Sequence, residues 1–368
     1  MKNYSQKSTK MKKIKSIFLY LIYISSLFTP TFGVQRYNIV DLTSYLPRNY
    51  VTDASVDYTA YIQKGLDMHR VVKMPDFPIC VNDKGLKISS NTEIYFQQNS
   101  KLLMAPTSKS IYAILWIVNV NNISIFSPNL EGDRDAHLNN KGEHGMGIHI
   151  MESSNIIINN PLIRNCWGDG IYIGGGKIPS SKILIKDGKI INNRRNGISI
   201  TNGVSITIAN CEVELSHGTN PMAGIDIEPN SPKNVINNIL LEDVTTRNNK
   251  NWGIVLSLNE IYSRDAKDIN ISIINHRDIG SKAALCLVSY THEKNPIPFT
   301  GSIKIKNPIW INNEEMIKVV GNNNIAPTTE IINIATQTEK TKQQRALNSV
   351  EKMKIKKMLY NKKNIFLK

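Results

Sequence analysis

Short runs of alternating hydrophobic and polar residues recur along most of this 368-residue chain. Six of them begin with a small residue that is followed by isoleucine or leucine at every second position, at residues 147–151, 170–174, 197–201, 224–228, 253–257 and 284–288. Their first residues lie 23, 27, 27, 29 and 31 positions apart. A period of two predicts short strands, and its recurrence at similar intervals predicts that like strands stack on like strands.

A second set of strands is predicted out of phase with the first, at residues 122–125, 155–158, 182–185, 205–208, 238–241, 270–273 and 302–305. A repeat of roughly 23 to 33 residues that already holds two strands leaves no room for a crossover helix. Parallel pairing without helices requires the chain to coil on itself, so the pattern predicts an all-β fold, a parallel β-helix.

One helix is expected ahead of the first coil. Tyr58, Ile62 and Leu66 fall on one face of a helical segment, with Ser55 or Asp57 as its N-cap. A helix in this place would cap the open end of the solenoid and hide its unpaired edge.

The charge of the chain is concentrated at its two ends. The net charge is +15, to which residues 1–33 contribute +6 and residues 339–368 contribute +8, so the body between them is nearly neutral. A near-neutral body argues against a nucleic-acid-binding surface. Near the N-terminus, lysines at positions 10 to 15 precede an apolar run over residues 14–28 and small residues near Gly33, which is typical of a secretory signal peptide.

We therefore predict a signal peptide over residues 1–33, a parallel β-helix domain over 34–338 and a basic C-terminal tail over 339–368. The signal peptide predicts a protein that is secreted, periplasmic or on the cell surface, with no stable membrane span after cleavage; an uncleaved anchor helix is the alternative. The tail is expected to form a basic helix that caps the last coil or contacts an anionic surface, or a solvated terminus. The four cysteines show no metal-site spacing.

The segment that leads into the first coil resembles a known superfamily. Residues 57–67, followed by 71–75 and 86–94, are similar to the start of pectin-lyase-like right-handed parallel β-helix proteins. That superfamily includes polygalacturonase-type hydrolases of glycoside hydrolase family 28, pectate lyases, mannuronan epimerases and phage tailspike depolymerases. The resemblance covers about residues 38–325 and implies a right-handed, single-stranded parallel β-helix. It is specific for the fold and weak for the activity, because one fold hosts many chemistries.

Strands of the first set place their isoleucines inside and the residues between them on the outer face. One outward column contains His149, Tyr172, Ser199, Asp226, Val255 and Cys286. The next contains Met151, Gly174, Thr201, Glu228, Ser257 and Val288. Aromatic faces and hydrogen-bonding side chains hold oligosaccharides, so we predict that His149, Tyr172 and Ser199 bind substrate. Ordinary solvated polar groups are the alternative.

Asp226 and Glu228 give the sharpest chemical signal. They lie two positions apart on one strand, so they share a face with their Cα atoms about 6.6 Å apart. Carboxylates this close repel each other, which raises one pKa and separates an acid from a base. Inverting glycosidases place their carboxyl groups roughly 6.5 to 9.5 Å apart. We predict a catalytic acid and base; a calcium site or a solvated acidic strand is the alternative, and no other cofactor is expected.

Asp169 is the third catalytic candidate, by resemblance. It occupies the position where polygalacturonase-type hydrolases carry the second aspartate of a pair, but Gly168 replaces the first. The next coil has Arg195-Asn-Gly where that family has Gly-His-Gly, and the preceding coil has His144-Gly-Met where it has Asn-Thr-Asp. Only one of the family's catalytic positions is therefore matched. Shaping the turn before Gly170 is the alternative role for Asp169.

The remaining binding candidates lie in loops and turns. Asp133 and His144 belong to a long loop that we expect to wall the substrate groove, with internal Asp–Arg pairing that orders the loop as the alternative. Arg194 and Arg195 lie one coil further and are placed to bind a uronate carboxylate through bidentate hydrogen bonds, or are plain surface arginines.

The sequence thus predicts an exported carbohydrate-active enzyme that cleaves a polysaccharide on the outer face of a β-helix, in the manner of a glycoside hydrolase. A lyase or epimerase that acts on uronates is the first alternative. Mannuronan epimerases carry a Tyr-Gly-Phe-Asp-Pro-His strand in which Asp226 is matched, whereas Ala223 and Glu228 replace the tyrosine and the histidine. A non-catalytic adhesin or glycan-binding β-helix is the second alternative.

Overall fold

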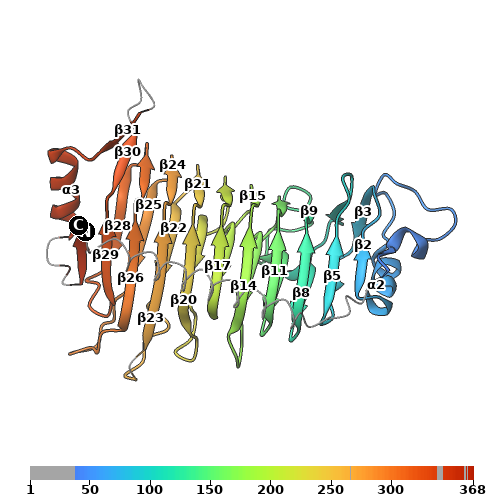
Figure 1. The fold of residues 1–368 in the computed structure, drawn as a ribbon, viewed down its shortest axis with the longest axis horizontal. Helices are drawn as coiled ribbons and strands as arrows, with labels where there is room; N and C mark the ends of the chain where they lie inside the picture. Colours follow the sequence, from blue (N-terminus) through green and yellow to red (C-terminus); the bar gives the residue numbers. More distant parts are fainter. Residues whose placement is uncertain (1–37, 266, 338–342, 360–361, 363) are drawn as a thin grey trace, which may run out of the picture. The chain divides into compact units, whose positions relative to one another are not determined.

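The structure is a computed structural model that describes residues 38–368, except 266, 338–342, 360–361 and 363. The signal peptide expected over residues 1–33 lies outside these residues. From Ile39 onward the chain forms one unit, a parallel β-helix in which three long sheets run side by side along the axis (Figure 1).

Each coil contributes strands to the sheets in turn. The 12-stranded sheet consists of β1 (Val40–Asp41), β2 (Val71–Lys73), β5 (Thr92–Tyr95), β8 (Asn121–Phe126), β11 (Ser154–Asn159), β14 (Ser180–Lys186), β17 (Gly203–Ala209), β20 (Ile236–Glu242), β23 (Asp268–Ile274), β26 (Thr300–Lys306), β29 (Thr328–Ile332) and β32 (Ile365–Leu367). The 9-stranded sheet consists of β4 (Leu86–Lys87), β7 (Ile111–Val118), β10 (His144–Met151), β13 (Ile171–Gly174), β16 (Ile198–Ile200), β19 (Ala223–Ile227), β22 (Trp252–Ser257), β25 (Ala283–Val288) and β28 (Glu315–Val320).

The third sheet was not predicted. Its 11 strands are β3 (Pro78–Val81), β6 (Lys101–Met104), β9 (Asn129–Glu131), β12 (Leu162–Arg164), β15 (Lys189–Ile191), β18 (Glu212–Glu214), β21 (Thr245–Arg247), β24 (Arg277–Ile279), β27 (Ile309–Ile311), β30 (Ala335–Gln337) and β31 (Gln344–Ala346). Most have three residues, of which only the middle one is buried, as Ile163 is in β12. A single inward residue gives no alternation to detect, so the sequence showed two strands in a coil that has three.

Columns of isoleucine fill the interior, as predicted. Ile198 in β16 pairs with Ile171 on one side and with Ile225 on the other, and all three side chains are fully buried. The described parallel strands keep this register from coil to coil, so each inward residue packs on its equivalent in the next coil. A buried aliphatic side chain contributes about 1.5 to 3 kcal/mol, which makes these columns the main source of stability.

Both ends of the solenoid are covered by helices (Figure 1). Helix α2 (Thr59–Met68) buries Tyr58, Ile62 and Leu66, which confirms the predicted face of the N-terminal helix. Its N-cap residue is Tyr58, while Asp57 accepts the hydrogen bond from the Thr59 N–H at 2.9 Å. A short 3-10 helix, η1 (Leu42–Tyr45), packs against α2.

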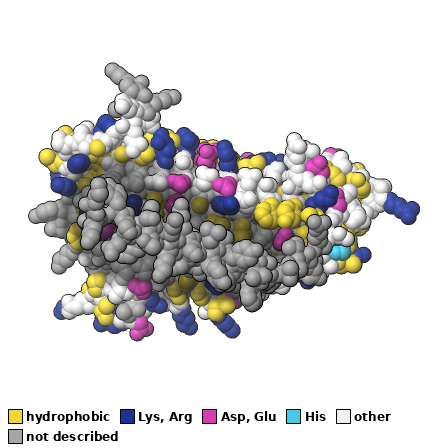
Figure 2. Space-filling model, in the orientation of Figure 1, with side chains coloured by type: hydrophobic (Ala, Val, Ile, Leu, Met, Phe, Trp, Pro, Cys, Tyr) yellow, Lys and Arg dark blue, Asp and Glu magenta, His cyan; other side chains and the backbone are white. Residues whose placement is uncertain are grey.

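The C-terminal residues continue the β-helix past position 338. Strand β31 pairs antiparallel with β30, and β32 adds a final parallel strand beside β29. Between them, α3 (Ser349–Leu359) buries Ile355 and Leu359. Within the described part of the chain, no helix is both long and apolar enough to cross a bilayer. Lysine and arginine side chains are interspersed with acidic ones over the described part of the face in Figure 2.

Candidate functional site

The outward column of the 9-stranded sheet has the predicted register. His149 pairs with Tyr172, Tyr172 with Ser199, and Ser199 with Asp226 in successive strands. Trp116 in β7 pairs with His149 and extends the column by one coil. We did not predict Trp116, because its strand lacks the small residue that begins the six segments recognised in the sequence. The column therefore runs from two aromatic residues and a histidine to a carboxylate.

The His149 ring stacks on Tyr172 and contacts the Trp116 ring at a tilt of 56°. The His149 ring centroid is 4.8 Å from that of Trp116 and 4.9 Å from that of Tyr172, with an angle of 12° between the His149 and Tyr172 planes. The Tyr172 hydroxyl forms a 2.9 Å hydrogen bond with Oγ1 of Thr201. Burial, together with the nearby His144, lowers the pKa of His149 to about 4, so its imidazole is neutral at pH 7. The column thus presents an uncharged row beside the carboxylates.

Glycines bring the turns of neighbouring coils close to this column. A Cβ atom on Gly170 would lie 2.5 Å from Cγ2 of Ile190 and 2.8 Å from the Gly197 carbonyl oxygen. Only glycine fits there, which explains the small residue at the start of the strands. The tight approach places Asp169, just before β13, beside the turn that carries Arg195 before β16.

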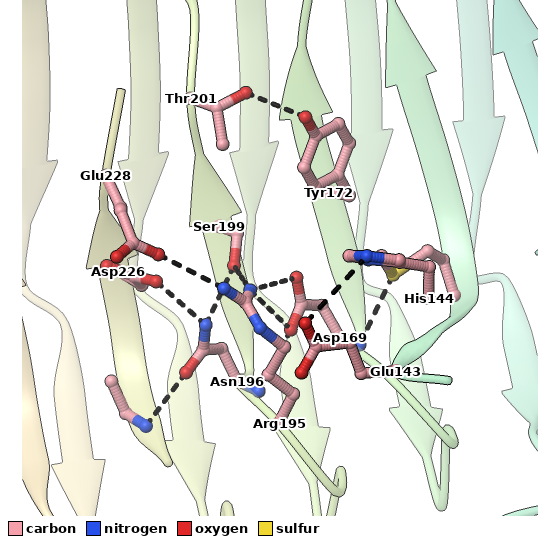
Figure 3. Close-up of polar contacts among 12 residues, drawn as sticks. Glu143, His144, Asp169, Tyr172, Arg195, Asn196, Ser199, Thr201, Asp226 and Glu228 are labelled. Atoms are coloured by element: carbon pink, nitrogen blue, oxygen red, sulfur yellow. Dashed lines mark hydrogen bonds and ion pairs between the residues drawn. The ribbon is translucent and has the colours of Figure 1, made fainter. Parts of the chain in front are cut away.

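Arg195 connects two of the three predicted catalytic carboxylates (Figure 3). Its Nη1 atom lies 3.1 Å from Oδ2 of Asp169, and its Nη2 atom lies 3.1 Å from Oε2 of Glu228. The Asp169 side chain is fully buried, whereas that of Glu228 is 35% exposed. Burial opposes the charge on the Arg195 guanidinium, but the carboxylates of Asp169, Asp226 and Glu228 outweigh it and raise the pKa of Arg195.

Asn196 connects Asp226, the third predicted catalytic carboxylate, to Asp169. We did not predict a role for Asn196 from the sequence. Its Nδ2 atom donates hydrogen bonds to Oδ2 of Asp226 at 2.9 Å and to Oγ of Ser199 at 3.1 Å. Its Oδ1 atom accepts from the Ala223 N–H at 3.0 Å, and its own N–H donates to Oδ1 of Asp169 at 3.0 Å. Asn196 is fully buried, so it holds the three side chains in fixed positions. We call Asp169, Arg195, Asn196, Asp226 and Glu228 the carboxylate cluster.

Asp226 is the electrostatically unusual member of the carboxylate cluster. Its side chain is buried, with 1% of the residue exposed. Burial, reinforced by the neighbouring carboxylate of Glu228, raises the pKa of Asp226 well above its usual range, although Arg195 acts in the opposite direction. Among the residues that the structure describes, Oδ1 of Asp226 and Nε of Arg195 are buried without a hydrogen-bond partner. The geometry can therefore hold a proton on Asp226 beside an ion pair between Arg195 and Glu228.

Asp133 and Arg194 do not join the carboxylate cluster. Asp133 is buried in its loop, where it accepts hydrogen bonds from the Tyr112 hydroxyl and from the Thr107 N–H at 3.2 Å. Arg194 lies over the Trp167 ring, with its guanidinium carbon 3.8 Å from the ring centroid. Although Arg194 and Arg195 are consecutive, their side chains bind different partners. These contacts of Asp133 differ from the internal Asp–Arg pairing that we considered as the alternative.

His144 lies at the edge of the carboxylate cluster (Figure 3). Its Nε2 atom is 3.9 Å from Oε1 of Glu143, and both side chains are more than 40% exposed. Its loop therefore borders the cluster, and its role as the wall of a substrate groove stays a prediction. Among the described residues, no group of three or more histidine, cysteine, aspartate or glutamate side chains is arranged to hold a metal ion.

A family of known proteins matches most of the solenoid. The family described as "Right handed beta helix region" matches this chain over residues 79–240 and 137–330, which together make up more than half of its length. The chain belongs to this right-handed β-helix family.

Two curated relatives come from Bacillus subtilis strain 168, and both are described as uncharacterized. YclG is 28% identical over 214 residues, which is 54% of this chain and 37% of YclG. The SPbeta prophage-derived protein YorA is 27% identical over 162 residues, which is 39% of this chain and 28% of YorA. The β-helix chain therefore spans well under half the length of either relative.

Several solved structures share the fold at low sequence identity. The A-module of mannuronan C-5 epimerase AlgE6 from Azotobacter vinelandii has a TM-score of 0.58 at 12% identity, covering 81% of this chain and 87% of the module. PfbA, a surface adhesin of Streptococcus pneumoniae, has a TM-score of 0.61 at 14% identity, covering 83% and 82%. An iota-carrageenase bound to iota-carrageenan fragments has a TM-score of 0.56 at 11% identity, covering 76% and 74%. These likenesses confirm the right-handed parallel β-helix.

Proposed function

We propose that this β-helix protein is a carbohydrate-active enzyme that cleaves a polysaccharide on the outer face of its 9-stranded sheet. The observation that carries the proposal is Asp226, a buried carboxyl with a raised pKa next to the ion-paired Glu228. A carboxyl group that keeps its proton near neutral pH is what a general acid for glycosidic cleavage requires.

The roles divide according to which carboxyl group holds a proton more readily. Asp226 would protonate the leaving oxygen of the glycosidic bond, and Glu228, the more exposed of the two, would activate the attacking water. Asp226 and Glu228 lie two residues apart on an extended strand and therefore share one face, which places the proposed acid and base side by side. Asp169 would act as a positioning residue rather than as an acid or a base, because both of its carboxylate oxygens accept hydrogen bonds from Arg195 and Oδ1 also accepts from the Asn196 N–H.

Several proteins of the same fold act on polysaccharides or bind them, which supports the proposed substrate class. The AlgE6 module is a mannuronan epimerase, and the carrageenase structure holds fragments of its polysaccharide. A tailspike protein of Acinetobacter baumannii bacteriophage Fri1, described as a capsular polysaccharide depolymerase, has a TM-score of 0.51 at 12% identity, covering 87% of this chain and 66% of the tailspike. The predicted signal peptide further suggests action outside the cytoplasm, which N-terminal sequencing of the exported protein would test.

A polysaccharide panel tests the proposed reaction. We expect new reducing ends without new ultraviolet absorbance, because hydrolysis creates no double bond, whereas elimination raises both signals together. Asp226→Asn and Glu228→Gln should each abolish the release of reducing ends. The matched control is Glu242→Gln, the same change at the end of β20 in the 12-stranded sheet. Full activity of both cluster variants would refute the assignment.

Glycan binding without catalysis is the second candidate, and one observation favours it. The carboxylates of Asp169 and Glu228 are both engaged by Arg195, as they would be in a purely structural network. PfbA, which shares the fold, is a surface adhesin. On this reading the panel would give retained glycan binding with no products, and Asp226→Asn would leave binding unchanged.

A further inference from the structure

The carboxylate cluster carries more negative than positive charge. Asp169, Asp226 and Glu228 surround a single guanidinium, that of Arg195. Even with a proton on Asp226, two carboxylates remain against one cation. Glu143 adds a further carboxylate at the edge of the cluster, close enough to influence the pKa of Arg195. The field at this part of the sheet is therefore negative.

Nearby cations are already bound by the protein. Arg195 holds Asp169 and Glu228, and Arg194 covers the Trp167 ring while donating a 3.0 Å hydrogen bond to the Gly142 carbonyl oxygen. Further along the outward column, Lys318 forms a 2.9 Å ion pair with Glu315. The histidine of the column, His149, is neutral at pH 7.

An anionic sugar directly over the cluster would meet this field, and Arg195, the guanidinium within the cluster, is already held by two carboxylates. A uronate carboxylate over the cluster would have to displace Asp169 or Glu228 from Arg195, and displacing Asp169 would leave a fully buried carboxylate unpaired. Each uncompensated negative charge at about 7 Å weakens the binding of an anion about tenfold at an effective dielectric constant of roughly 35. Hydroxyl groups, in contrast, can donate hydrogen bonds to these carboxylates.

We propose that the sugar bound over the carboxylate cluster carries no carboxylate or sulfate group, so that the substrate is an uncharged glycan rather than a polyuronate. This inference rests on the proposed function and narrows its substrate class. It argues against the uronate recognition that we predicted for Arg195, whose guanidinium holds Asp169 and Glu228. A charged sugar would instead meet a cation at Lys87, which pairs with Trp116 at the other end of the column, several coils away from the cluster.

Matched glycan pairs test the inference by binding alone. Oligosaccharides of polygalacturonate, polymannuronate and heparosan are each compared with their carboxyl-reduced forms, which differ only by CH2OH in place of the carboxylate. Calorimetry is carried out with the full-length mature protein, with Glu228→Gln and with the remote control Glu242→Gln. We expect the reduced form of at least one pair to bind about tenfold more tightly or better, by the charge argument above.

Two further readouts identify the cause. Raising the salt concentration from about 0.05 to 0.5 M should shrink the difference within a pair, because the repulsion is screened. Glu228→Gln should also narrow the affinity difference within a pair, because the uronate form should bind more tightly once this carboxylate is removed. Glu242→Gln should leave the difference unchanged. Equal or tighter binding of the uronate form in every pair that binds would overturn the inference and leave the proposed function intact. If no member of these pairs or of the wider panel binds, the proposed function falls and the inference falls with it.

Discussion

Replacing Asp226 by asparagine should make this protein more stable at neutral pH while it removes turnover. The Asp226 carboxyl is buried beside the Glu228 carboxylate, and both the burial and this neighbour raise its pKa. The folded protein therefore keeps a proton on Asp226 at pH values where the unfolded chain has lost it, which costs about 1.4 kcal/mol for each pH unit in that interval. In Asp226→Asn the amide oxygen can still accept the hydrogen bond from Asn196, and the amide NH2 can donate toward Glu228. We therefore expect a gain of about 1 to 3 kcal/mol in the free energy of unfolding at neutral pH.

The gain should depend on pH in a defined direction. The pKa of Asp226 is raised in the folded state, so the stability contributed by its protonated form is fully present below the unfolded pKa of about 3.9 and is lost as the pH rises through the folded pKa. Asparagine does not titrate. The stability difference between Asp226→Asn and the unmodified protein should therefore be small near pH 3 and grow as the pH increases.

Urea unfolding between about pH 4 and pH 8 measures this difference, with Asp243→Asn as the matched control. Asp243 is an exposed turn residue with φ 52°, a conformation that asparagine adopts readily. The control should change stability little at any pH. A less stable Asp226→Asn protein at pH 7, or a stability difference that does not vary with pH, would refute the electrostatic argument for Asp226.

Three other changes test the fold and the cluster. Ile225→Asp places a carboxylate in a fully buried column and should cost several kcal/mol and prevent soluble folding, whereas Ser272→Asp on the outward face of β23 should not; soluble expression and melting decide between them. Arg195→Met leaves the Asp169 carboxylate buried without its cation and should destabilise the fold by about 3 to 5 kcal/mol in urea; a loss below 1 kcal/mol would mean that the ion pair is dispensable. Burial lowers the pKa of His276 to about 3, below its unfolded value of about 6.5, so the neutral imidazole contributes stability that is lost as the pH falls between these values. The midpoint of urea unfolding should show this loss, and His276→Asn should reduce its pH dependence.

Residues on the longer strands were predictable one by one. The period of two assigns every position from 224 to 228 to the inside or the outside of the coil. The repeat then predicts that Ser199 lies beside Asp226, which the register confirms. The column from His149 to Asp226, the shared face of Asp226 and Glu228 and the buried face of α2 all follow from local patterning. Such features depend only on backbone geometry, which is the same in every coil.

Turns were less predictable, because the direction of a turn side chain depends on what the neighbouring coils offer it. Asn192 and Asn193 are consecutive in one turn, yet the Asn192 side-chain amide donates to Oδ1 of Asn165 at 2.7 Å. Asn193 points inward instead, and its Oδ1 accepts a hydrogen bond from the Cys166 N–H. A difference of one residue in a turn thus exchanges a half-buried position for a fully buried one.

The sequence by itself determined the coil, its core and the pair of carboxylates on one strand. The tertiary structure alone decided which residues surround that pair. Arg194 and Arg195 are adjacent and chemically identical, yet one covers Trp167 and the other joins Asp169 to Glu228, two residues that are 59 positions apart in the sequence. The physical reason is that close packing at Gly170 and Gly197 brings three coils together, so the partners of each charge are set by contacts between coils and not by the neighbours along the chain.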